Sequence, residues 1–122
     1  MVRGALATIY VSDMDQAVDF YTRVLGLELE ARYGDEWASI DAGDRTHLDL
    51  HPRSPHGPAP GISGSISIGL AVTEPLVEVM DHLREEGVAF RGPVQGDPNA
   101  SIRLAFFGNP DGNDLYLFEN GN

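Results

Sequence analysis

The sequence predicts an α+β fold built from two tandem βαβββ units. A short apolar strand leads into an amphipathic helix near residue 13, and the same pattern returns 61 residues later. The matching positions are Val11 and Val72, Asp13 and Glu74, Val18 and Val79, Arg23 and Arg84, and Gly26 and Gly87. One helix for every four strands fits a fold in which each helix covers one face of its own sheet. We therefore expect a single domain over 1–122, with units at 1–52 and 65–122 and a linker at 53–64.

The first unit is expected to begin with a strand at 5–11 that leads into a helix. Apolar residues of this helix recur with a 3.6-residue period, at Met14, Ala17, Val18, Tyr21 and Leu25. Asp13 can cap the first turn, with Gln16 completing a capping box, and Gly26 supplies the left-handed residue that ends a helix. Strands are then expected at 27–33, 37–41 and 46–51, with turns at 34–35 and 42–44.

The second unit follows a linker, RSPHGPAPGISG, that contains too much proline and glycine for a regular element. A strand at 65–72 leads into a helix with Thr73 or Glu74 as its cap and Pro75 at its first position. The apolar face of this helix consists of Leu76, Val79, Met80 and Leu83. Three more strands are expected, around Ala89–Phe90, at 102–107 and at 114–119, with a loop at 94–101 and a tight GNPDGN turn at 108–113.

The composition excludes several classes of function. The chain has no cysteine, and its eight basic residues are all arginine, which removes disulfides, thiolate chemistry and Schiff-base lysines. The net charge of -11 and the absence of a basic stripe argue against nucleic acid as a partner. No apolar run approaches the ~20 residues of a membrane span, and no signal peptide is evident, so we expect a cytoplasmic protein without a membrane partner. The acidity would attract a cationic small ligand, although acidic residues also keep proteins soluble.

Strand alternation predicts which side chains point away from the helices. If Leu48 and Leu50 pack inward, then His47, Asp49 and His51 share the opposite face. The other residues expected on this face are Leu6, Thr8, Tyr10, Trp37, Ser39, Asp41, Ser67, Gly69, Ala71, Asp114, Tyr116 and Phe118. Such a mixture of aromatic, small and acidic side chains suits a ligand-binding surface.

Seven residues are candidates for contacting a ligand: Trp37, Asp49, His47, Tyr10, Tyr116, Phe107 and Arg103. Trp37 can stack on a planar ligand or a cation, or it can fill a hydrophobic gap or a dimer contact. Asp49 can hold a cationic group, and the tyrosine hydroxyls need partners if they are buried. Phe107 can line the cavity or lie in the core, whereas Arg103 can bind an anion or pair with an acidic residue. We assign no catalytic residue and no metal ligand.

Two segments resemble a known family. VSDMDQAVDFYTRVLGL at 11–27 and NPDGN at 109–113, just before the last strand, resemble the vicinal oxygen chelate superfamily. This superfamily includes glyoxalase I, extradiol dioxygenases and bleomycin resistance proteins. The resemblance covers nearly the whole chain. It implies two βαβββ units whose mixed sheets curl around a concave, half-open cavity, and a homodimer with sites at or near the subunit interface.

The resemblance also implies where a metal would bind. The ligand positions of the family's metalloenzymes align with Leu6, Asp49, Ser67 and Tyr116. Of these, only Asp49 carries a good donor, whereas a divalent metal needs at least three converging donors. His47, Asp49 and His51 alternate along one strand and are spread by about 6.6–6.8 Å per pair, so they diverge. We therefore expect no cofactor.

Three functional hypotheses follow. The first is a metal-independent protein of the antibiotic-resistance type, which sequesters a cationic or planar aromatic small molecule. The alternative is a glyoxalase-like lyase or dioxygenase-like metalloenzyme with a divalent metal in a shifted site, for which His47, Asp49, His51 and Glu119 are the available donors. A third is metal-free catalysis, with His47 and Asp49 or a Tyr–Asp pair as acid and base. We favour binding over catalysis.

Overall fold

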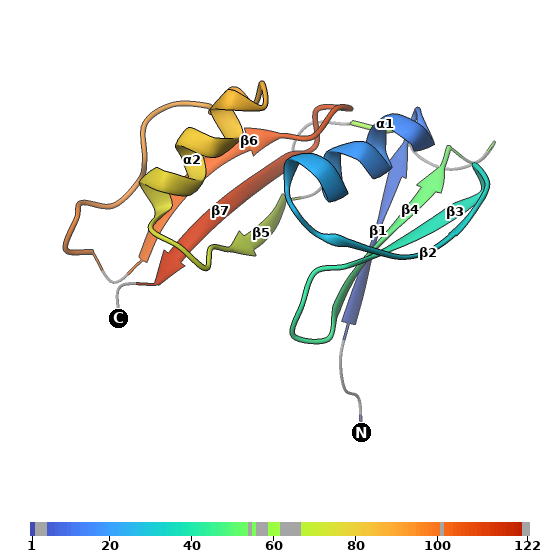
Figure 1. The fold of residues 1–122 in the computed structure, drawn as a ribbon, viewed down its shortest axis with the longest axis horizontal. Coiled ribbons are helices and arrows are strands. Elements are labelled where there is room, and N and C mark those ends of the chain that lie inside the picture. Colours follow the sequence, from blue (N-terminus) through green and yellow to red (C-terminus); the bar gives the residue numbers. More distant parts are fainter. Residues whose placement is uncertain (2–4, 54, 56–58, 62–66, 101, 121–122) are drawn as a thin grey trace. The chain divides into compact units, whose positions relative to one another are not determined.

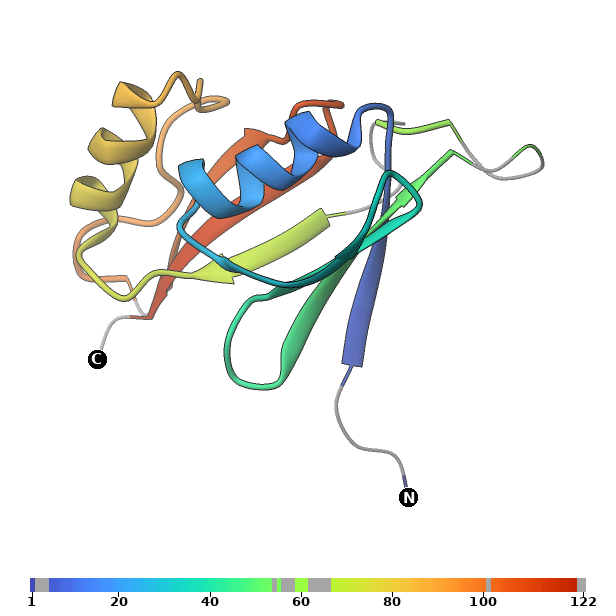
Figure 2. The ribbon, with the colours of Figure 1, turned by 45° about the vertical axis from the view of Figure 1, so that its right-hand side comes forward.

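The computed structural model describes residues 1, 5–53, 55, 59–61, 67–100 and 102–120. The chain divides into two compact units, Met1–Ile62 and Ser63–Asn122. The division falls inside the segment 53–64 that the sequence marks as a linker. That the two units form one domain stays a prediction. In each unit a helix lies along one face of a small sheet (Figures 1 and 2).

The first unit has the predicted βαβββ order. Its elements are β1 (Ala5–Val11), α1 (Met14–Asp19), η1 (Phe20–Val24), β2 (Glu28–Tyr33), β3 (Trp37–Asp41) and β4 (Thr46–Pro52). The sheet order is β1-β4-β3-β2, in which β1 and β4 are parallel and the other pairs are antiparallel. β4 is therefore a central strand with partners on both sides, and α1 packs against β4 and β3.

The second unit repeats this topology with one strand fewer. Its elements are β5 (Ser67–Ala71), α2 (Leu76–Glu85), β6 (Ile102–Gly108) and β7 (Asp114–Asn120), in the sheet order β5-β7-β6. β5 and β7 are parallel, like β1 and β4, so the α+β prediction of two tandem units is confirmed. The first two residues of the predicted strand at 65–72 lie outside the described residues.

The strand predicted around Ala89–Phe90 is reduced to isolated bridges. Phe90 pairs with Phe107, and Gln95 pairs with Leu104, so this segment runs along the edge of β6 without forming a regular ladder. Between the two bridges lie Gly92, at φ +74°, and a proline that has no amide hydrogen to donate. The expected eighth strand is thus replaced by a broken edge segment.

The first helix is capped as predicted but does not stay regular. The Asp13 carboxylate accepts a hydrogen bond from the Gln16 amide at 2.9 Å, and Gly26 follows the helix at φ +77°. After Asp19 the helix widens into the π-helical turn η1, where the Leu25 amide bonds to the Phe20 carbonyl. The Thr22 hydroxyl donates to the carbonyl of Val18 at 2.6 Å, which competes for the acceptor that an α-helix would use.

The second helix is capped from another strand. Pro75 is the N-cap residue of α2 rather than its first helical residue, and neither Thr73 nor Glu74 occupies the cap position. The first helical amide, on Leu76, donates to a Glu119 carboxylate oxygen of β7 at 2.7 Å. The other oxygen of Glu119 lies 3.6 Å from an Arg103 nitrogen. A carboxylate at this end of a helix satisfies a free amide and interacts favourably with the helix dipole.

The cores confirm most of the predicted inward faces. Buried side chains of the first unit include Ile9, Val11, Met14, Ala17, Tyr21, Ile40, Leu48 and Leu50, and those of the second include Leu76, Met80, Leu83, Ala105, Phe107, Leu115 and Leu117. In β5 the inward residues Ile68 and Leu70 are only half-buried. No helix in the described part of the chain is long and apolar enough to cross a membrane.

We predict that Glu119→Gln lowers the free energy of unfolding by about 1 kcal/mol, because the amide keeps the shape of the cap but loses its charge. Urea denaturation measures this change. Glu85→Gln, at the exposed opposite end of α2, is the matched control and should change the value by less than about 0.5 kcal/mol. Equal effects of the two variants would contradict a capping role for Glu119.

Candidate ligand-binding site

The face of the four-stranded sheet opposite α1 carries most of the predicted candidates, and we call it the open face of the first unit. Strand register sets Thr8 and Ser39 on either side of Asp49, while His47 lies beside Leu6 and His51 beside Tyr10. Tyr33 and Trp37 are register partners on the same face. This agrees with the predicted alternation, although Ser39 is buried, with only 6% of its surface exposed.

Trp37 and Asp49 form the central contact of this face. The indole Nε1 of Trp37 donates a hydrogen bond to Oδ2 of Asp49 at 3.1 Å, and both side chains are half-buried. Trp37 also stacks on Tyr33, with the ring centroids 5.3 Å apart and the planes inclined by 30°. Tyr33 itself is 69% exposed. The two rings thus present a flat aromatic surface next to a carboxylate.

The second carboxylate oxygen of Asp49, Oδ1, is a buried polar atom without a hydrogen-bond partner among the described residues, as is Nδ1 of His47 on the same strand. A buried acceptor without a donor costs about 1–3 kcal/mol, and more when it is charged. Such an atom in a native protein calls for an explanation, such as a water or a ligand that supplies the donor.

The two histidines beside Asp49 interact with other groups. Nδ1 of His47 lies 2.8 Å from a Glu30 carboxylate oxygen, and Nδ1 of His51 lies 2.8 Å from the Pro52 carbonyl oxygen. The His51 ring also meets Tyr10 edge-on, with centroids 5.8 Å apart. Sequence reasoning missed Glu30 because a β-bulge between Leu29 and Ala31 shifts the register there, and no pattern in the sequence marks the bulge.

The second unit has an aromatic open face of its own. Tyr116 lies between Phe106 and Phe118, with ring centroids 5.3 and 6.3 Å away. Its ring lies against Gly69 of the parallel neighbour β5, where a Cβ atom would come within 2.5 Å of the ring carbons. Gly69 therefore allows the Tyr116 ring to lie close to the backbone of β5.

Two candidates lie on the other side of this sheet. Phe107 pairs in register with Leu115, and Arg103 pairs with Glu119, so both share the helix-facing side with Leu117. Phe107 is fully buried against Phe90, which places it in the core, one of its two predicted positions. Arg103 pairs with Glu119 near the start of α2 and not with an acid of the open face. The aromatic residue of β6 that does lie on the open face is Phe106.

The residues at the four positions aligned with the metal ligands of the superfamily's metalloenzymes do not form a suitable set of donors. Leu6 has no donor atom and is 58% exposed, Asp49 already accepts from Trp37, and the Tyr116 ring packs against Gly69. Glu119, a donor considered for a shifted site, faces α2. Across the described residues no group of three or more histidine, aspartate or glutamate side chains is arranged to hold a metal ion.

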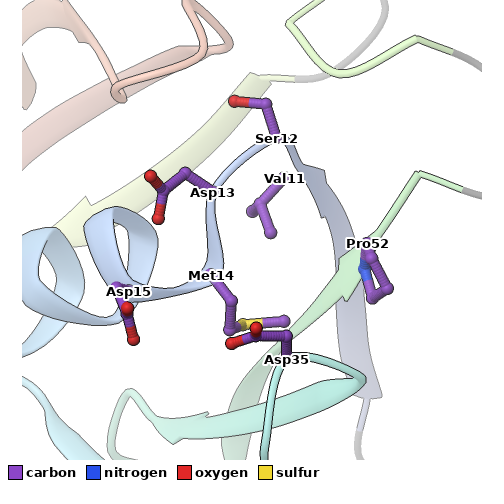
Figure 3. Close-up of a pocket in the computed structure, with 7 residues that line it drawn as sticks. All are labelled: Val11, Ser12, Asp13, Met14, Asp15, Asp35 and Pro52. Carbon is purple, nitrogen blue, oxygen red and sulfur yellow. The ribbon is translucent and has the colours of Figure 1, made fainter.

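A separate hollow of about 350 Å³ lies where β1 meets α1 (Figure 3). Val11, Ser12, Asp13, Met14, Asp15, Asp35 and Pro52 line it. Its carboxylates have structural partners: Asp13 caps the helix, and Arg32 bonds to Asp15 and Asp35 at 2.6 and 3.1 Å. The bond to Asp15, more than that to Asp35, raises the pKa of Arg32. The hollow is therefore bordered by a helix cap and by solvent-exposed ion pairs.

The fold defines a class of protein with two tandem units of the βαβββ type, each of which carries aromatic side chains on the sheet face opposite its helix. The sequence profile of the Glyoxalase/Bleomycin resistance protein/Dioxygenase superfamily matches residues 5–117. The chain belongs to this superfamily. A search of curated proteins gave no match.

Solved structures of similar proteins cover nearly the whole chain. TnmS3, an antibiotic binding protein from Streptomyces sp. CB03234, is 31% identical, with a TM-score of 0.78 and coverage of 98% of this chain and 97% of that one. A superfamily member from Sphaerobacter thermophilus DSM 20745 is 30% identical, with a TM-score of 0.77 and coverage of 98% of both chains. A glyoxalase/bleomycin resistance protein from Streptomyces sp. CB03234 is 32% identical, with a TM-score of 0.72 and coverage of 94% and 98%.

We predict that Gly69→Ala lowers the free energy of unfolding by about 1–3 kcal/mol, because the new methyl group overlaps the Tyr116 ring. The double variant Gly69→Ala/Tyr116→Leu should recover most of this loss, since leucine lacks the ring atoms that collide. Urea denaturation of the four proteins of this double-mutant cycle measures the coupling. Additive effects would show that the Tyr116 ring does not rest on Gly69.

Proposed function

We propose that this protein binds a planar aromatic or cationic small molecule without a metal ion, and that it sequesters an antibiotic-like compound in this way. The Trp37–Asp49 pair on the open face of the first unit is the observation that carries the proposal. It places an aromatic surface beside a carboxylate with unused acceptor capacity. We expect from the family resemblance that the protein acts as a cytoplasmic homodimer.

The physical chemistry of this face suits such a ligand. Aromatic pairs contribute about 0.5–1.5 kcal/mol beyond the area that they bury, so a planar ring gains by stacking on Trp37 or Tyr33. A cation over the face of an indole gains a further electrostatic attraction. The net charge of -11 raises the local concentration of cations around the protein.

The similarity to TnmS3 supports the class of function. That protein is described as antibiotic binding, and it is 31% identical over almost the whole length of both chains. The fold alone does not specify a ligand, because related architectures host unrelated functions. The identity of the ligand must therefore come from the side chains of the open face.

We expect planar cations to quench the fluorescence of Trp37, the only tryptophan, in a saturable manner. The probes are an acridinium dye as a planar cation, a naphthalene amide as a neutral planar compound, and tetramethylammonium as a compact cation. Asp49→Asn should weaken binding of the acridinium dye about tenfold, since the half-buried carboxylate loses the charge that attracts the cation.

Asp41→Asn is the matched control for this titration. It removes the same charge from the neighbouring strand on the same face, and its amide oxygen can still accept from the Gly43 amide. It should change the affinity by less than about twofold, as expected for a screened surface charge. Absence of binding by all three probes would argue against the proposed function.

We also expect that binding is independent of metal. Treatment with EDTA followed by dialysis should leave the affinity for the acridinium dye unchanged, because the aligned ligand positions lack three good donors. Readdition of Zn²⁺, Ni²⁺, Mn²⁺ or Fe²⁺ should also have no effect. A dye affinity that falls after EDTA and returns with one of these ions would favour the metalloenzyme alternative.

A further inference from the structure

We propose that Asp49 recognises a hydrogen-bond donor on the ligand, and that the indole N–H of Trp37 occupies the place of this donor in the free protein. This inference rests on the proposed function and narrows its ligand class. The ligand is then a planar aromatic compound that carries an N–H or O–H group, and Trp37 is an internal competitor as well as a stacking surface.

Asp49 uses only part of its capacity to accept hydrogen bonds. A carboxylate has about four lone-pair positions on its two oxygens. In the described residues Asp49 receives one hydrogen bond, from the Trp37 indole to Oδ2, while Oδ1 is buried without a donor. Asp49 is thus desolvated but only partly satisfied, which favours any further donor that can reach it.

None of the described neighbouring side chains donates a hydrogen bond to Oδ1 of Asp49. Nδ1 of His47 lies 2.8 Å from a Glu30 carboxylate oxygen, and Nδ1 of His51 lies 2.8 Å from the Pro52 carbonyl oxygen, so neither nitrogen is directed at Oδ1. Arg32, the only arginine on β2, bonds to Asp15, Asp35 and the Gly34 carbonyl. The Thr8 and Ser39 hydroxyls flank Asp49 in the sheet register, yet no described residue donates to Oδ1, so this oxygen has room for a donor on the ligand.

Access to Oδ2 of Asp49 requires the indole to move, because the indole N–H is bonded to this oxygen. Oδ1 has almost no exposed surface, and Trp37 is the side chain bonded to the same carboxylate. Trp37 is itself only half-buried, and its stacking partner Tyr33 lies on the edge strand β2 and is 69% exposed. Among the described residues, one hydrogen bond and one aromatic stacking contact hold the indole, at the first residue of β3. A ligand donor that replaces the indole N–H can use both oxygens, and the displaced indole remains free to stack on the ligand.

Two acridine probes separate donor recognition from stacking and charge. One carries an amino group on its central ring and is protonated near neutral pH, and the other is methylated on its ring nitrogen. Both are planar cations of similar size, but only the amino compound has N–H donors. We expect the wild-type protein to bind the amino probe about tenfold more tightly, as measured by the absorbance and fluorescence of the dyes.

Trp37→Phe is the decisive variant, because it keeps an aromatic ring beside Tyr33 and removes the competing N–H, while the methylated probe reports any effect of the smaller ring. The affinity for the amino probe should rise about threefold or more, while that for the methylated probe changes by less than about twofold. Asp49→Asn should abolish the preference between the two probes. Tyr33→Leu is the control for stacking, and it should lower the affinity for both probes by the same factor.

A second measurement does not depend on the stability of any variant. The single tryptophan gives one indole N–H resonance, and saturation with the amino probe should shift it and speed its exchange with solvent. The methylated probe should leave its exchange protected.

If Trp37→Phe weakens both probes equally and the indole N–H stays protected with both, Trp37 only stacks, and the inference fails while the proposed function stands. If neither probe nor any compound of the wider panel binds the wild-type protein, the proposed function fails as well.

Discussion

The alternation of side chains along the central strand β4 is the constraint on which the first unit depends. Because β4 has hydrogen-bonded neighbours on both sides, its register is fixed by β1 and β3 together. Leu48 and Leu50 are almost fully buried under α1, so Asp49 between them has to point to the opposite face. A slip by one residue would bury Asp49 in the core and expose both leucines. The hydrophobic effect thus determines where the carboxylate of the candidate site lies.

This constraint leaves Asp49 in an environment that is not optimal for stability. The strand holds the carboxylate in place, the Trp37 indole satisfies one oxygen, and the other lacks a donor among the described residues. An apolar side chain of similar size at this position would avoid the cost of burying a partly satisfied acceptor. Binding sites commonly carry such a cost, because groups that await a ligand cannot also be satisfied within the protein. The recognition role that we propose for this pair would account for this cost.

Features set by local chemistry could be predicted from the sequence, whereas those set by strand register could not. The Asp13 cap and the left-handed Gly26 and Gly87 follow from residue type and spacing, and so does the buried stripe of α2. The reach of Glu119 to Leu76 across 43 residues has no local signature. Likewise, which residues of β6 face the helix depends on how the preceding loop enters the strand. For this reason the sequence left the position of Phe107 open and missed Phe106, whereas it missed Glu30 because of the β-bulge between Leu29 and Ala31.

The two units share a topology but differ in the chemistry of their open faces. In the first unit, Thr8 of β1 lies opposite Asp49 of the central strand β4, and the open face is rich in groups that form hydrogen bonds. In the second unit the corresponding pair is Gly69 opposite Tyr116, and the face is a cluster of aromatic rings. The same register position therefore carries a carboxylate in one copy and a ring in the other. A duplicated scaffold can diverge in this way without loss of its fold, because neighbouring outward residues can change together once the inward leucines are kept.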